Sequence, residues 1–285
     1  MRGFARAVVA LFTQGAVGAF WAIVAVRFWA AGSVGWPRAD AWAFPVLIGI
    51  LASALLGLAL SLAALWHSKR SARTPSNLRR PWPGREFLFA FLFLIFACAT
   101  APIKFFPLGI PLLAGAADGI AALLGALAIW SMAEAYRLRA APPWNRWITR
   151  ATFFTTTLLV GVLAAGVGLA FGPAPPDLLW AALGYAALTA LGFLLAQTLI
   201  AFVWIKGLTD GPPETQVAAD HVLDGRRSML IARMILAGMA TLACAVAAFS
   251  EWAAPVGLCA AFGCALASEA LGRVLFDEAC NNVSS

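Results

Sequence analysis

Long apolar runs, separated by short polar segments, fill almost the whole chain. A helix needs about 20 apolar residues to cross the hydrocarbon core of a bilayer, and the runs reach or exceed this length. Strands of a membrane barrel would instead be about 10 residues long, with alternating polarity. The pattern therefore predicts eight transmembrane helices. They lie near residues 4–31, 42–66, 86–104, 108–133, 151–172, 178–205, 229–249 and 253–276.

Two of these helices have unusual ends. The third is expected to end early, because Pro102 and Lys104 interrupt its apolar run and Pro107 follows soon after. The first begins with Arg2 and Arg6, as a secretory signal peptide does. Its apolar stretch is too long for a signal peptide and no small-x-small cleavage motif follows, so we interpret it as a retained span.

The composition agrees with this pattern. The chain of 285 residues is 62% hydrophobic and 12% charged, with a mean hydropathy of +0.85. A soluble domain is about a quarter charged, and it could not bury this much apolar surface. All of the 12 Trp except Trp21 lie at or near a predicted helix end, where the membrane–water interface favours indole rings. We predict an all-α polytopic integral membrane protein, with residues 1–285 in a single membrane domain.

The basic residues predict the orientation. Most of the 20 Lys and Arg residues lie in the N-terminal segment and in the loops 67–85, 134–150 and 206–228, which all fall on one side of the membrane. The opposite loops hold little beyond Arg38 and Lys104. The positive-inside rule places the basic side, and both termini, in the cytoplasm of a bacterial cell with the chain in its cytoplasmic membrane. The net charge of +7 then reflects topology and not a nucleic-acid surface.

The cysteines and histidines give little sign of a bound metal. The 5 cysteines form no C-x-x-C pair and have no Cys/His ligand spacing, so they are expected to be small buried hydrophobic residues. We therefore expect no iron–sulfur cluster in this chain. Haem b held by two histidines is disfavoured, because His67 and His221 both lie in or beside loops.

Ionisable residues inside the predicted helices are costly in lipid, so each is a candidate functional residue. Apart from Arg27, they fall toward the basic side of the membrane, and the other leaflet is expected to hold almost nothing polar. This pattern favours a site entered from one side over a channel. The candidates are Arg27, Glu86, Glu134, Arg233, Glu269 and Arg273.

Glu86 and Glu269 are the carboxylates of most interest. Glu86 opens a predicted helix, where the helix dipole stabilises a negative charge. Glu269 is four residues from Arg273, so both lie on one helix face. The alternative interpretation of Glu269 and Arg273 is an ion pair that only packs helices together. His67 has a similar alternative, as a residue that merely sits at the membrane interface.

Three segments resemble one known family in the same order. They are His67 with NLRRPWPGREFL at 77–88, EAYRLRAAPPWN at 134–145, and SEALGRVLF at 268–276. Together they resemble the DMSO reductase anchor subunit family, whose members belong to molybdopterin oxidoreductase complexes. The chain length and the eight spans also fit this family. One departure follows His67, where Ser68-Lys69-Arg70 stand in place of the family's Leu-Gly pair.

The resemblance implies that this chain anchors a molybdopterin catalytic subunit and an iron–sulfur subunit to the membrane. It also implies that the anchor exchanges electrons with menaquinone or ubiquinone. The quinol-site residues of the family map onto Glu86, beside Arg85, and more loosely onto His67. Oxidation of a quinol releases two protons, and a carboxylate or a histidine can accept them. We expect these residues to cluster with Glu269 and Arg273 as the quinone-binding site.

The basic loops are the expected docking surface for the iron–sulfur subunit, through electrostatic attraction. The residues concerned are Arg79, Arg80, Arg137 and Arg139.

Three alternatives stay open. The same anchor could serve a dehydrogenase that reduces quinone, such as a sulfite-oxidising complex. A small-solute transporter would need charged or broken helices near the midplane and often an internal repeat, and neither stands out in the sequence. A purely structural anchor would tolerate replacement of Glu86 and His67 without loss of quinone turnover.

Overall fold

A computed structural model describes residues 2–71, 82–105, 111–139, 147–173, 176–211 and 213–283. Within these ranges all regular secondary structure is helical, and eight helices are long and apolar enough to span a membrane, as predicted. The long helices are α1 (Arg2–Val34), α2 (Trp36–Ser71), α3 (Trp82–Phe105), α4 (Pro111–Arg139), α5 (Trp147–Ala170), α6 (Pro176–Thr209), α8 (Arg227–Phe249) and α9 (Ala254–Val283).

Several helix ends differ from the predicted ones. Helix α2 begins at Trp36 and not near residue 42, because Gly35 has a φ of 79° and turns the chain sharply after α1. The Gly35 amide donates to the carbonyl of Ala31 at 3.0 Å, which caps α1. Pro102 lies inside α3, which continues to Phe105.

The segment between α6 and α8, which the sequence pattern predicts as a loop, contains a short helix. Helix α7 (Pro213–Asp220) is followed by one π-helical turn, η3 (His221–Gly225). Pro213 stands at the first helical position, where its missing N–H costs nothing. Helix α7 packs against α6 and α9.

Helices α1 and α5 form the centre of the bundle. Helix α1 packs against α2, α4, α5 and α9, and α5 packs against α1, α4, α6 and α9. The two central helices meet at Gly18 and Gly161, where a Cβ atom on either residue would overlap the backbone of the other helix. Small residues allow such close approach of helices in membranes, where packing drives helix association.

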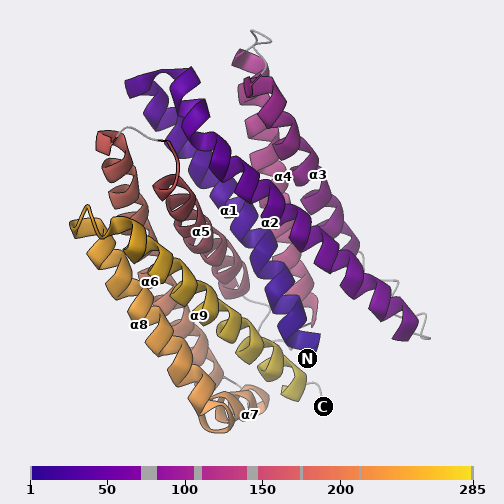
Figure 1. Cartoon of the computed structure of the whole chain (residues 1–285). Coiled ribbons are helices and arrows are strands. Elements are labelled where there is room, and N and C mark those ends of the chain that lie inside the picture. Colours follow the sequence, from indigo (N-terminus) through magenta and orange to yellow (C-terminus); the bar gives the residue numbers. More distant parts are fainter. Residues whose placement is uncertain are drawn as a thin grey trace.

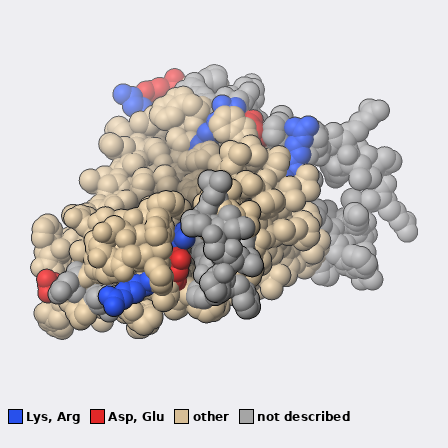
Figure 2. Space-filling model, turned by 90° about the horizontal axis from the view of Figure 1, so that it is seen from above, with Lys and Arg blue, Asp and Glu red and all other residues tan. Residues whose placement is uncertain are grey.

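The outer helices expose apolar side chains. Leu199 on α6 and Met234 and Leu242 on α8 are each about two-thirds exposed. On the face seen in Figure 2, the charged atoms of the described residues form a few small groups among uncharged residues. Outer helices with such exposed apolar side chains are stable only in contact with lipid, so the chain is a multi-pass membrane protein.

The described parts of the two chain ends lie at the same end of the bundle, which we call the terminal end (Figure 1). The turn between α1 and α2 lies at the opposite end, which we call the far end. Helices α1, α3, α5 and α8 run from the terminal end to the far end, and α2, α4, α6 and α9 run back.

Candidate functional site

A chain of buried hydrogen bonds joins α5, α6 and α9 in the terminal half of the bundle. The Thr156 hydroxyl donates to Oε2 of Glu269 at 2.7 Å. The Gln197 side-chain amide donates to the Thr156 hydroxyl at 2.6 Å. All three side chains are at most 5% exposed. A carboxylate is therefore held deep in the helix bundle by a hydroxyl that is itself fixed by an amide.

Arg273, one turn after Glu269 on α9, faces α1. Its Nη2 donates to Oε1 of Gln14 at 2.9 Å, and Nε2 of Gln14 donates to the backbone carbonyl of Phe153 at 2.9 Å. The guanidinium carbon lies 3.6 Å from the centre of the Phe153 ring and 5.8 Å from that of Tyr136, which adds cation–π attraction. Gln14, Thr156, Gln197, Glu269 and Arg273 are named the Glu269 cluster below.

A small cavity of about 50 Å³ adjoins the Glu269 cluster between α5, α6, α8 and α9. Gln197, Arg233, Glu269 and Arg273 are among its lining residues. Within the described part of the chain, the buried Oε1 of Gln197 has no hydrogen-bond partner. Since a water molecule occupies about 30 Å³, the cavity has room for about one that could bond to this oxygen.

Gly272 keeps Arg233 beside this cavity. A Cβ atom at Gly272 would come within 2.9 Å of the Arg233 guanidinium carbon, so a larger residue would displace the side chain. The Ser268 hydroxyl donates to the Arg233 carbonyl at 3.1 Å and ties α8 to α9 at the same level. Two arginines and one glutamate therefore meet where four helices approach one another.

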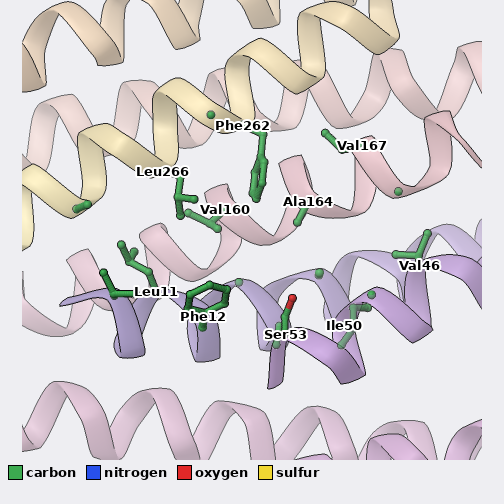
Figure 3. A pocket seen from close by; sticks show the side chains of 18 of the residues that line it. Leu11, Phe12, Val46, Ile50, Ser53, Val160, Ala164, Val167, Phe262 and Leu266 are labelled. Atoms are coloured by element: carbon green, nitrogen blue, oxygen red, sulfur yellow. The ribbon is translucent and has the colours of Figure 1, made fainter. Parts of the chain in front are cut away.

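A much larger cavity of about 520 Å³ lies between α1, α2, α5 and α9, and it is partly open to the surroundings of the bundle (Figure 3). The walls of this cavity are mostly apolar, so an apolar molecule fits it better than water does. Its lining includes Leu11, Phe12, Val46, Ile50, Val160 and Phe262.

The large cavity borders the Glu269 cluster. On α1, Gln14 lies three residues after the lining residue Leu11. On α9, Arg273 lies three residues after the lining residue Ala270. Residues three or four apart share a helix face, so the Gln14–Arg273 pair stands at the edge of the apolar space.

A second buried polar group, named the Arg27 triad below, ties α1, α2 and α4 together in the far half of the bundle. Nη1 of Arg27 donates to Oδ2 of Asp118 at 2.6 Å, and its Nε donates to Oδ1 of Asp40. The Arg27 and Asp118 side chains are 7% and 2% exposed. The guanidinium carbon also lies 5.0 Å from the centre of the Trp36 ring.

The Arg27 triad shows that one expectation was wrong, because the far leaflet is not bare of polar groups. Asp40 and Asp118 were not among the candidate residues predicted from the sequence. The signal was present, since Asp118 interrupts the apolar run 108–133 and Asp40 stands two residues before the predicted span 42–66. Their common partner could not be read from the sequence, because Arg27 and Asp118 are 91 residues apart.

The predicted quinone-site residues fall on different helices. The structure brings Glu269 and Arg273 to one region of the core. Arg85 and Glu86 lie near the start of α3, which packs against α4 and α2. Glu86 is half-buried and Arg85 is exposed. Among the side chains that the structure describes, no residue of α3 lines either of the two cavities beside the Glu269 cluster.

The remaining predicted residues lie outside the described parts. His67 belongs to α2, but its side chain is not among those described. The same holds for the side chains of Arg137 and Arg139 at the end of α4, and Arg79 and Arg80 lie wholly outside the described residues. Their proposed roles stay predictions.

A group of three or more His, Cys, Asp or Glu side chains placed to hold a metal ion is not found among the described residues. The four described cysteines, Cys98, Cys244, Cys259 and Cys264, are free thiols.

The sequence matches one protein family over nearly its whole length. The family model described as DMSO reductase anchor subunit (DmsC) matches residues 7–277. No curated protein and no solved structure matches the chain.

Proposed function

Since the chain belongs to the DMSO reductase anchor subunit family, we propose that it is the quinone-reactive membrane anchor of a molybdopterin oxidoreductase complex. In this role it holds a molybdopterin catalytic subunit and an iron–sulfur subunit at the membrane. It passes electrons between a quinol, menaquinol or ubiquinol, and the iron–sulfur partner.

A buried carboxylate beside a large apolar cavity is the observation that carries this proposal. Oxidation of a quinol to a quinone releases two electrons and two protons. The electrons pass to an iron–sulfur cluster of the partner, and each hydroxyl needs a group that accepts its proton. Glu269 can accept one, because its partner Thr156 has a hydroxyl that can either donate or accept a hydrogen bond.

Arg273 and Gln14 supply the donors in the same region. A guanidinium and an amide can donate to a quinone oxygen, which carries more negative charge as the quinone is reduced. His67, Arg85 and Glu86 are proposed, through the family resemblance, as a second group that takes part in quinol oxidation. Glu86 on α3 serves a proton step at a place separate from Glu269.

The partner subunits are proposed to dock at the terminal end, on the loops that carry Arg79, Arg80, Arg137 and Arg139. A basic surface attracts an acidic partner and guides its approach. By the positive-inside rule this end faces the cytoplasm of a bacterial cell. The same acid–base groups serve electron flow in either direction, so a quinone-reducing dehydrogenase, for example one that oxidises sulfite, would use the same site.

The test is to purify the affinity-tagged chain with its partners in mild detergent and to analyse the complex by mass spectrometry and for molybdenum and iron. We expect a molybdenum subunit and a multi-cluster iron–sulfur subunit. Anaerobic addition of menaquinol or ubiquinol should then reduce the clusters, as followed by electron paramagnetic resonance.

Purification of the chain without molybdenum or iron would contradict the anchor role and would favour a small-solute transporter. The full complex could also purify with clusters that exchange electrons with quinone in neither direction. In that case no quinol reduces the clusters and the reduced clusters do not reduce bound quinone, which would leave a structural anchor without redox function.

A further inference from the structure

The large cavity has the elongated shape that suits a long hydrocarbon chain. Its lining residues run from Val8 to Ala19 on α1 and from Phe262 to Ala270 on α9. At 1.5 Å per residue these stretches are about 16 Å and 12 Å long. The cavity therefore extends along the helix axes for several turns, which suits an extended flexible molecule better than a compact solute.

The walls of the cavity are apolar. Ser53 on α2 is the single polar side chain among the described lining residues, and its hydroxyl points into the space (Figure 3). A buried water molecule needs two to four polar partners, which these walls do not offer. A hydrocarbon chain therefore fits this space better than water does.

Two glycines keep the cavity open. A Cβ atom added at Gly49 on α2 or at Gly263 on α9 would meet no heavy atom within 4 Å. Both residues line the cavity, so a larger side chain there would enter empty space and would not collide with protein. Gly168 differs, because a Cβ atom there would come within 3.0 Å of Val46. The space could therefore be filled from Gly49 or Gly263 without disturbing helix packing.

The polar border of the cavity indicates which kind of lipid-soluble molecule carries this hydrocarbon chain. Gln14 and Arg273, at its edge, are 0% and 4% exposed, so a head group that reaches this pair lies inside the bundle. A phospholipid carries a charged head group that must stay at the membrane surface. A quinone carries a flat, uncharged ring with two oxygens that accept hydrogen bonds, and this ring can enter the core.

We propose that the cavity between α1, α2, α5 and α9 holds the isoprenoid chain of the quinone, with the ring beside the Gln14–Arg273 pair. This inference rests on the proposed function, since it presumes that the chain reacts with quinone. The ring then lies within the core close to Glu269, and the isoprenoid chain runs from it toward the far end.

The experiment fills the cavity with the variants Gly49→Leu and Gly263→Leu in the purified complex. Gly238→Leu on α8 is the matched control, because that exposed glycine also has no neighbour within 4 Å and lies outside the cavity. Two quantities are measured: the long-chain quinone that copurifies, by solvent extraction and mass spectrometry, and the kinetics with long-chain and with tail-less quinols.

We expect Gly49→Leu and Gly263→Leu to lower the amount of copurified quinone at least ten-fold. We also expect them to raise KM for long-chain quinol about ten-fold. Their turnover of a tail-less quinol should stay within two-fold of the wild type, as should all values for Gly238→Leu. Unchanged binding of long-chain quinol in both cavity variants would overturn the inference. Loss of a stoichiometric phospholipid in place of quinone would also overturn it.

A second measurement does not depend on the folding of any variant. A quinone with a photoreactive group at the end of a short isoprenoid chain is cross-linked to the wild-type complex. Labelled peptides from the cavity, such as those with Val46 or Val167, are expected, and labels confined to other helices would contradict the placement. If the wild-type complex reacts with no quinol at all, the proposed function fails, whereas a normal reaction with labels elsewhere refutes only the cavity.

Discussion

The Arg27 triad and the Glu269 cluster are both buried, yet they compensate charge in different ways. In the triad, one guanidinium meets two carboxylates, Asp40 and Asp118. In the cluster, the Glu269 carboxylate accepts a hydrogen bond from a hydroxyl, and Arg273 donates to an amide. An ion pair needs both partners charged, whereas a hydroxyl can hydrogen-bond to a carboxylate or to a carboxylic acid.

Their surroundings differ as well. The cavity beside the Arg27 triad is about 20 Å³, too small for a substrate. The Glu269 cluster borders cavities of about 50 and 520 Å³. The Arg27 triad is therefore a polar group that joins three helices, whereas the Glu269 cluster is one that can contact a ligand. Burial and charge are common to both, so they do not by themselves indicate function.

The largest effect on stability is expected from Arg27→Met. This change leaves the buried Asp118 and the partly buried Asp40 without their cation, and removing one partner of a buried ion pair costs about 3–5 kcal/mol. The Tm of the purified complex in detergent should fall markedly. Arg38→Met is the control, because Arg38 is exposed on the same end of α2. Equal Tm values for the two variants would contradict a structural role of the Arg27 triad.

In contrast to Arg27→Met, the variant Glu269→Gln is expected to change Tm little and to lose most of its quinol turnover. The amide has nearly the same volume, and its oxygen can still accept from Thr156, but it cannot take up a proton. Quinol turnover should fall on the order of 100-fold. Glu251→Gln, at an exposed position in the turn between α8 and α9, should keep full turnover. Retention of turnover in Glu269→Gln would shift the proton-accepting role to another residue.

Thr156→Val should give an intermediate result. Valine has the same shape but removes the donor to Glu269 and the acceptor for Gln197, which costs about 1–3 kcal/mol for the buried groups left without a partner. We expect a lower Tm and about a tenfold loss of quinol turnover, since tenfold corresponds to about 1.4 kcal/mol.

The control for this change is Thr198→Val. The Thr198 hydroxyl donates only to the Leu194 carbonyl of its own helix, at 2.9 Å. Identical Tm and turnover for the two valine variants would show that the hydrogen-bonded chain through Thr156 does not matter.

The smallest effect is expected from Arg150→Met. Nε of Arg150 lies 2.6 Å from the Glu134 carboxylate, but the Arg150 side chain is 36% exposed. Water competes for such a pair, so its loss should cost no more than about 1 kcal/mol. Thermal unfolding of Arg150→Met beside Arg27→Met tests whether burial sets the difference. A fall in Tm as large as that of Arg27→Met would contradict this explanation.

The helices were largely predictable because they depend on neighbouring residues. Each long helix was recognised from its apolar run, and two of the errors occur where a single residue overrides the pattern. Gly35 allows α2 to start at once after α1, and Pro213 starts a short helix inside a polar segment. The candidate site was only partly predictable. Glu269 and Arg273 stood out as charges in an apolar run, but uncharged Gln14, Thr156 and Gln197 gave no comparable signal.

The sequence by itself determined that this protein crosses a membrane eight times, because the transfer of a helix into lipid depends on about 20 consecutive residues and on little else. Only the tertiary structure decided which polar groups meet. Thr156 and Glu269 are 113 residues apart, and Gln14 and Arg273 are 259 residues apart. These contacts depend on the packing of α9 against both α1 and α5, and no local pattern records which helices will become neighbours.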